Sequence, residues 1–128
     1  NMIVYFFYIF AFKYINNEDT LINEIINCSI NHNLNIFKCK DIKKINNHIH
    51  KQNIDIIILD IDCLNYERIE CFKLIKTSFN KPIIIISSDN NTYNIVLFFS
   101  LGADDYVVKP LSTKELIMRI QAIYNRNK

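Results

Sequence analysis

The chain is poor in glycine and in net charge, and each shortage excludes a class of protein. Among its 128 residues there is a single glycine, Gly102, so no glycine-rich phosphate loop follows the first expected strand. Flavodoxin-like cofactor binders need such a loop. Fifteen basic and thirteen acidic side chains leave a formal charge of +2, which is too small for the basic footprint of a nucleic-acid-binding domain. Any contact with DNA must therefore come from another domain.

The chain also lacks paired cysteines and a long apolar segment. Its four cysteines form no CxxC pair and show no metal-ligand spacing with the three histidines, so we interpret them as reduced, unreactive thiols of a cytoplasmic protein. The apolar opening at residues 2–12 falls short of the roughly 18 to 20 residues that span a bilayer, and no small-residue cleavage site follows it. We expect no membrane segment and no secretion signal.

What the chain does contain is a regular alternation of strand-like and helix-like segments. Short apolar runs predict strands near residues 9–15, 34–38, 54–60, 82–87 and 105–108, with residues 1–8 as a candidate N-terminal extension of the first. Helical spacing predicts helices from Glu18, over 42–51, 67–79 and 92–101, and from Ser112. Right-handed crossovers then give a doubly wound, flavodoxin-like α/β fold: one parallel sheet in the order 2-1-3-4-5, with helices on both faces. We expect one domain over residues 1–128.

Three of the expected helices have features of their own. In the helix over 67–79 we expect five inward residues: Ile69, Phe72, Leu74, Ile75 and Phe79. In the last helix, which Ser112 caps with Glu115 in a capping box, we expect four: Leu116, Ile117, Ile120 and Ile123. The helix over 92–101 carries no charged residue, so it is either packed on both sides or part of a contact surface.

Three of the expected strands end at chemically active side chains. The run at 54–59 ends at Asp60, the run at 82–86 ends at Ser87, and the run at 106–108 ends at Lys109. The carboxyl ends of parallel strands share the edge where open α/β sheets bind ligands, so we expect these three side chains to converge. An acid, a hydroxyl and an ammonium suit the chemistry of a phosphoryl group. Taken singly, each is also an ordinary polar strand end.

These segments resemble the CheY-like receiver domains of response regulators, and within them the OmpR/PhoB-like class that controls winged-helix DNA-binding domains. The strongest match is residues 101–116, LGADDYVVKPLSTKEL, which is similar to the fifth strand and fifth helix of that class. The run that ends at Asp60 and residues 81–88 match the third and fourth strands. From about residue 14 onward the chain fits the class in register.

The resemblance implies a role for each strand-end side chain. Asp60 would be the phosphoacceptor that forms an acyl phosphate, Lys109 would pair with it and then with the phosphoryl group, and Ser87 would donate its hydroxyl to that group. Tyr106 would be an aromatic switch that turns inward when this bond forms, although simple half-burial at the sheet edge also explains a tyrosine there. The family has a cis bond before the next proline, so we expect one between Lys109 and Pro110.

The expected metal site departs from the family pattern. Receivers of this class carry two acids after the first strand that bind Mg²⁺ together with the phosphoacceptor; counted back from Asp60, these positions are Asn16 and Asn17. Asparagine offers a neutral oxygen in place of a carboxylate, so we expect Mg²⁺ affinity to be weakened or lost and phosphorylation to be slow. Glu18 and Asp62 are candidates to replace part of the missing pair.

Other departures also indicate a degenerate receiver. Leu64 and Glu67-Arg68 replace the usual proline and Asp-Gly after the phosphoacceptor, and Asp89 adds negative charge beside the site.

The resemblance also implies a dimer face on the fourth helix, fifth strand and fifth helix. Four residues match those that form intersubunit ion pairs there: Asp104, Asp105, Glu115 and Arg119. Ile95 lies where a basic partner is expected, so an apolar contact would replace one ion pair. Ordinary surface charge is the alternative interpretation.

The leading hypothesis is the receiver domain of a cytoplasmic two-component response regulator, phosphorylated on Asp60 by a sensor histidine kinase to shift a homodimer face. Such a domain is not an enzyme beyond its own phosphoryl transfer and hydrolysis, and it would control transcription only through a C-terminal DNA-binding domain absent from this chain. The alternative is a phosphorylation-independent module that dimerises constitutively. A flavodoxin-like cofactor binder is a third reading, which the missing glycine loop disfavours.

Overall fold

The computed structural model describes residues 2–8, 23–24, 27, 34–39, 55–63 and 67–126. Within these ranges the chain forms a parallel sheet of five strands in the order β2-β1-β3-β4-β5. The strands are β1 (Met2–Tyr8), β2 (Leu34–Cys39), β3 (Ile56–Asp60), β4 (Ile83–Ser87) and β5 (Asp105–Val108). The predicted fold class and strand order are therefore confirmed.

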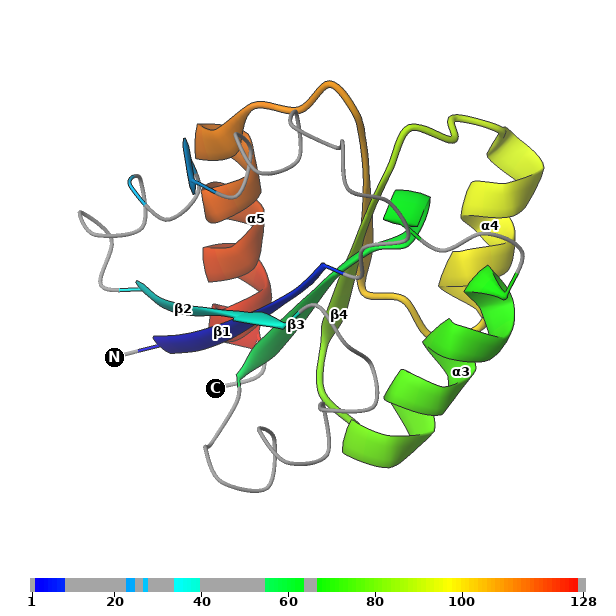
Figure 1. Cartoon of the computed structure of the whole chain (residues 1–128), viewed down its shortest axis with the longest axis horizontal. Helices are drawn as coiled ribbons and strands as arrows, with labels where there is room; N and C mark the ends of the chain where they lie inside the picture. Colours follow the sequence, from blue (N-terminus) through cyan, green and yellow to red (C-terminus); the bar gives the residue numbers. More distant parts are fainter. Residues whose placement is uncertain are drawn as a thin grey trace.

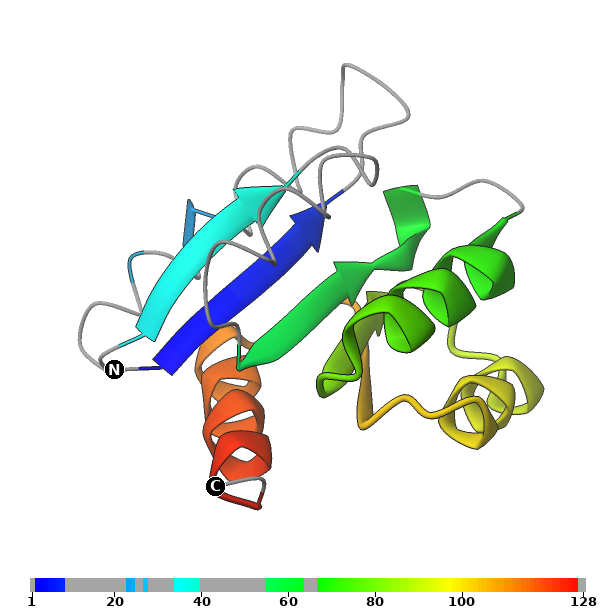
Figure 2. The same cartoon turned by 90° about the horizontal axis from the view of Figure 1, so that it is seen from below.

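Helices cover both faces of this sheet (Figures 1 and 2). The helices are α3 (Arg68–Phe79), α4 (Thr92–Ser100) and α5 (Thr113–Arg126), and a 3-10 turn, η3 (Ile61–Cys63), directly follows β3. Helices α3 and α4 lie on one side of the sheet and α5 lies on the other. Residues 23, 24 and 27 are helical, in keeping with the helix expected from Glu18, while the helix expected over 42–51 lies outside the described residues. No helix in the described ranges is long and apolar enough to cross a bilayer.

The first strand begins earlier than the sequence pattern predicted. We expected it at 9–15 with residues 1–8 as an extension, but β1 is Met2–Tyr8, and residues 9–15 lie outside the described ranges. Its register pairs Val4 with Ile56 and Tyr8 with Asp60. Residues 2–8 read MIVYFFY, which is β-branched, aromatic and uncharged, and so suits a strand with neighbours on both sides. The apolar opening is longer than one strand, so apolar content alone did not define the strand's position.

The core is built on β3 and β4, whose residues are all buried. Between the sheet and helices α3 and α4, the ring of Phe98 contacts two others: its centroid lies 5.7 Å from that of Phe72, edge-on, and 6.1 Å from that of Tyr106. On the other face, the four predicted residues of α5 are buried: Leu116, Ile117, Ile120 and Ile123. Aromatic pairs and full burial of aliphatic side chains supply most of the stabilisation of such a core.

One inward residue of α3 was predicted wrongly. Leu74 is 58% exposed, whereas Cys71, Phe72 and Ile75 form the buried face of the helix. Because each residue turns a helix by about 100°, Leu74 lies roughly 200° around the axis from Phe72 and cannot share its face. Ile69 and Phe79 are partly buried and pack against the core, as expected.

Local signals fix where the elements begin and end. The Ser112 hydroxyl accepts a hydrogen bond from the Glu115 N–H at 3.3 Å, which confirms Ser112 as the N-cap of α5. The Asn91 side chain caps α4 by accepting from the Asn94 N–H at 3.2 Å. Gly102 has a φ of +112° in the turn between α4 and β5, a conformation that favours glycine.

Candidate functional site

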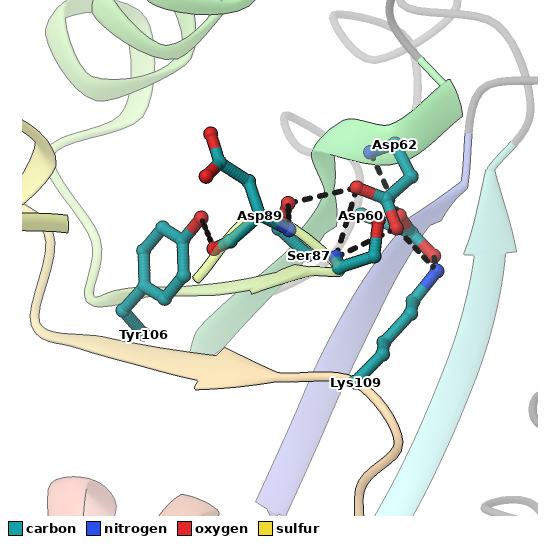
Figure 3. Close-up of polar contacts among 7 residues, drawn as sticks. Asp60, Asp62, Ser87, Asp89, Tyr106 and Lys109 are labelled. Atoms are coloured by element: carbon teal, nitrogen blue, oxygen red, sulfur yellow. Dashed lines mark hydrogen bonds and ion pairs between the residues drawn. The ribbon is translucent and has the colours of Figure 1, made fainter. Parts of the chain in front are cut away.

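The three predicted side chains meet at the carboxyl edge of the sheet (Figure 3). Asp60 ends β3, Ser87 ends β4, and Lys109 directly follows β5. The Lys109 ammonium lies 2.7 Å from Asp60 Oδ2, and both this ammonium and the Ser87 hydroxyl contact the carboxylate of Asp62, at 3.2 and 2.7 Å. The predicted convergence is therefore confirmed. The Lys109-Pro110 peptide bond is cis, as expected.

Asp60 is a buried carboxylate with partners on both oxygens. Its Oδ2 pairs with Lys109, and its Oδ1 accepts a hydrogen bond from the backbone N–H of Asp62 at 3.0 Å. Its side chain is 1% exposed. A carboxylate this deep in the fold needs such partners, because removing a charge from water without compensation is costly.

A second acid, Asp62, occupies the centre of the site. It comes from η3, and its carboxylate accepts three kinds of donor: the Ser87 hydroxyl at 2.7 Å, the Ser88 N–H at 2.9 and 3.1 Å, and the Lys109 ammonium at 3.2 Å. Burial opposes ionisation of Asp62, but the Ser87 hydrogen bond and the Lys109 charge outweigh it, so the pKa of this carboxyl is lowered.

From the sequence, Asp62 was expected only as a candidate metal ligand, and its contacts with Ser87, Ser88 and Lys109 were not predicted. The only signal was an acid two positions after Asp60. Whether that acid turns back toward β4 depends on η3, which the apolar pattern does not predict.

Ser87 is linked to Tyr106 through the loop after β4. The Ser87 Oγ accepts from the Asp89 N–H at 3.0 Å, and the Tyr106 hydroxyl donates to the Asp89 carbonyl oxygen at 2.8 Å. Tyr106 is buried and its ring packs against Phe98 of α4. Burial raises the pKa of Tyr106, and the nearby charges of Asp89 and Asp62 act in the same direction.

The described residues offer only part of a metal site. The carboxylates of Asp60 and Asp62 are hard oxygen ligands of the kind that Mg²⁺ takes, but both are engaged by Lys109. Within the described ranges, no group of three or more acidic, histidine or cysteine side chains is placed to hold a metal ion. The other candidate ligands, Asn16, Asn17 and Glu18, lie outside those ranges. The two acids therefore fit such an ion only together with ligands from elsewhere.

Three residues of the expected dimer face form an ion network within the chain. Arg119 of α5 pairs with Asp105 of β5 at 2.9 Å and with Glu115, one helical turn away, at 2.9 Å. The hydrogen bonds that Arg119 donates to these two carboxylates raise its pKa. Asp104 lies apart from them: its Oδ2 accepts from the Ile83 N–H at 2.8 Å and lies 3.6 Å from the ammonium of Lys76.

The uncharged helix α4 has an exposed apolar face. Tyr93, Val96 and Phe99 are 76%, 59% and 44% exposed, whereas Phe98 is buried in the core. Ile95 is half-buried and packs against the core. Of the two explanations for the missing charge, a contact surface fits this exposure better than packing on both sides.

Of the four cysteines, Cys71 is described as a buried free thiol. Burial, together with the charge of Glu67, raises the pKa of Cys71 to about 11. This thiol is therefore protonated and unreactive at neutral pH, as expected.

Comparison with known proteins agrees with this geometry. The family model described as the response regulator receiver domain matches residues 15–121, a range that begins after β1. The response regulator protein GraR of Staphylococcus aureus is 31% identical over 112 residues, which cover 88% of this chain and 50% of that protein. The chain thus spans about half the length of the curated relatives that it matches.

Solved structures show the same fold. The receiver domain of the Francisella response regulator 1452 superimposes with a TM-score of 0.81 at 26% identity and covers 100% of both chains. The BeF3-activated N-terminal receiver domain of Klebsiella pneumoniae RstA gives a TM-score of 0.74 at 18% identity, over 95% of this chain and 97% of that one. From the matched range, the GraR relative and this shared fold, we conclude that the chain belongs to the response regulator receiver domain family of two-component systems.

Proposed function

We propose that this receiver domain is phosphorylated on Asp60 and belongs to a cytoplasmic regulator of transcription. The observation that carries the proposal is the buried Asp60 carboxylate, held 2.7 Å from the Lys109 ammonium at the edge where β4 ends in Ser87. A sensor histidine kinase would supply the phosphoryl group. The DNA contact would come from an effector domain outside this chain, because the charge of +2 gives the chain no basic footprint of its own.

The site residues suit a phosphoryl transfer to carboxylate. An Asp60 oxygen forms the new bond to phosphorus, while the bond from phosphorus to the donor's nitrogen or oxygen breaks and its electron pair leaves with the donor. Lys109 neutralises charge on the transferred group, and the Ser87 hydroxyl donates a hydrogen bond to one of its oxygens.

A divalent cation would assist this step. Receiver domains bind Mg²⁺ in an acidic pocket; in this chain Asp60 and Asp62 would contribute to it, and the ion would neutralise negative charge on the phosphoryl group. Because asparagine occupies positions 16 and 17, we expect a weaker site than in receivers with two acids there.

The signal would leave the site through Tyr106. Its hydroxyl reaches the loop that Ser87 also binds, and its ring packs on α4, so a shift at Ser87 would change the α4 face. That change would bias a two-state equilibrium toward a homodimer through α4, β5 and α5. The residues proposed for this interface are Asp104, Asp105, Glu115, Arg119 and Ile95.

The test is incubation of the chain with acetyl phosphate and millimolar Mg²⁺, followed by intact mass measurement. We expect the mass of one added phosphoryl group, which Asp60→Asn abolishes while the thermal unfolding transition remains. An adduct that persists in Asp60→Asn would show that the phosphoacceptor is a residue other than Asp60. No adduct at any Mg²⁺ concentration would reject phosphorylation as the input.

One observation favours a second function, a phosphorylation-independent interaction module. The donors expected to hold a phosphoryl group already bind the Asp62 carboxylate. Helix α4 also exposes apolar side chains although Asp60 carries no phosphoryl group. Sedimentation of the untreated chain separates the two functions. A dimer at micromolar concentration that acetyl phosphate does not strengthen supports the module, whereas a monomer that dimerises only after phosphorylation supports the switch.

A further inference from the structure

We propose that Asp62 is a resident anion: its carboxylate fills the hydrogen-bond donors that a phosphoryl group on Asp60 would use, and it must withdraw before such a group is held. The proposal assigns to Asp62 a gating role over the anion site, and it rests on the proposed phosphorylation of Asp60. The evidence for it is the set of contacts that the Asp62 side chain makes.

The donors around Asp62 are those of an anion site. A hydroxyl from Ser87, a backbone N–H from Ser88 and the ammonium of Lys109 all point at the two Asp62 oxygens, at distances between 2.7 and 3.2 Å. Charge-assisted hydrogen bonds and backbone N–H groups at the end of a strand favour a negatively charged ligand. Here the ligand is supplied by the chain itself.

Asp62 and a group on Asp60 would compete for the same place. The two acids lie on one short turn, where the Asp62 N–H donates to Asp60 Oδ1, and both carboxylates bind the Lys109 ammonium. A phosphoryl group attached to Asp60 would bring further negative charge beside Asp62. Like charges on neighbouring groups repel strongly when they are shielded from water. The Asp62 side chain, which is only 15% exposed, must therefore turn away from Asp60.

The neighbouring acid Asp89 does not take part in this competition. Its Oδ1 accepts from the Asn91 N–H and its Oδ2 from the Asn94 amide, each at 2.9 Å, so its carboxylate is directed at the start of α4. Asp89→Ala therefore removes one negative charge near the site and leaves the Asp62 contacts in place. It is the matched control for Asp62→Ala.

The first experiment does not need Asp60 to react. Inorganic phosphate is titrated into the ¹⁵N-labelled chain while the amide resonance of Ser88 is followed. We expect a saturating shift in Asp62→Ala and no shift in the unmodified chain or in Asp89→Ala. Equal responses of Ser88 in all three proteins would overturn the proposal. If Asp62→Ala does not fold, Asp62→Asn, which keeps the side-chain shape without the charge, takes its place.

The second experiment measures the rate of the phosphoryl adduct with acetyl phosphate and Mg²⁺. At saturating Mg²⁺, where a weaker ion site does not limit the rate, we expect Asp62→Ala to react about tenfold faster than Asp89→Ala, because one strong charge repulsion is lost. Equal acceleration in both variants would mean that net charge alone matters, which rejects the role of Asp62. If none of the proteins forms an adduct, phosphorylation of Asp60 is rejected, and the phosphate titration still decides on Asp62.

Discussion

One ammonium group, that of Lys109, lies against two carboxylates at the edge of the sheet. The pairing with Asp60 could be predicted from the sequence, because both residues end apolar strands and parallel strands end at a common edge. The pairing with Asp62 could not, because it depends on the backbone path of η3. The side chains at strand ends can therefore be predicted from the sequence, whereas the contacts made by a residue in a short turn cannot.

Lys109→Met tests what this ammonium contributes to stability. The substitution removes the Lys109 ammonium from the buried Asp60 carboxylate, so we expect the free energy of unfolding to fall by about 3 kcal/mol. Urea denaturation followed by circular dichroism measures the change.

The double variant Asp60→Asn with Lys109→Met is the control, because it removes both charges. It should recover part of the loss, since the deeply buried Asp60 charge is gone while the Asp62 carboxylate still lacks the Lys109 ammonium. A double variant as unstable as the single one would show that the lysine stem stabilises the fold by packing rather than by charge.

Among the elements, α3 and α4 differ in how well their sequences define the buried face. In α4, Phe98 is buried while three apolar residues stay exposed, and in α3 Leu74 is exposed although its neighbours Phe72 and Ile75 are not. Apolar residue type alone therefore overestimates burial, and helical spacing corrects it only where polar residues mark the outer face. In the uncharged α4 the polar residues Thr92, Asn94 and Ser100 lie toward the two ends, so residues 95–99 have no such mark.

Val96→Lys tests whether the exposed face of α4 is a contact surface. We expect weaker self-association, because a charge in the apolar centre of an interface must lose its hydration. Stability should change by no more than about 0.5 kcal/mol, since Val96 is an exposed side chain.

Sedimentation velocity over a concentration series measures this effect, and Leu74→Lys is the matched control on α3, where an apolar residue is equally exposed. If both lysine variants lower self-association to the same extent, or neither does, α4 is not the surface involved.

For the whole molecule, the alternation of strands and helices was enough to predict the order 2-1-3-4-5, since crossover rules leave few other arrangements. The position of the first strand was the exception. The other four strands were predicted to within about two residues at each end, whereas the apolar opening is longer than one strand and does not mark where the strand begins. Long-range pairing with β2 and β3 decides its register.

Removal of residues 1–8 tests this assignment. Because β1 is a central strand between β2 and β3, we expect the shortened chain to lose its cooperative thermal transition, as followed by circular dichroism. A shortened chain that unfolds cooperatively near the original temperature would contradict this assignment and favour residues 9–15 as the first strand. Removal of residues 127–128 is the control and should leave the transition unchanged.

The Arg119 network bears on how two copies of this domain would recognise each other. Because Arg119 is already satisfied by Asp105 and Glu115 of its own chain, any bond to a second copy exchanges one carboxylate for another and adds little attraction. Association would therefore respond weakly to ionic strength. The aliphatic and aromatic groups of α4 would set the affinity, and the ion pairs would set only the orientation.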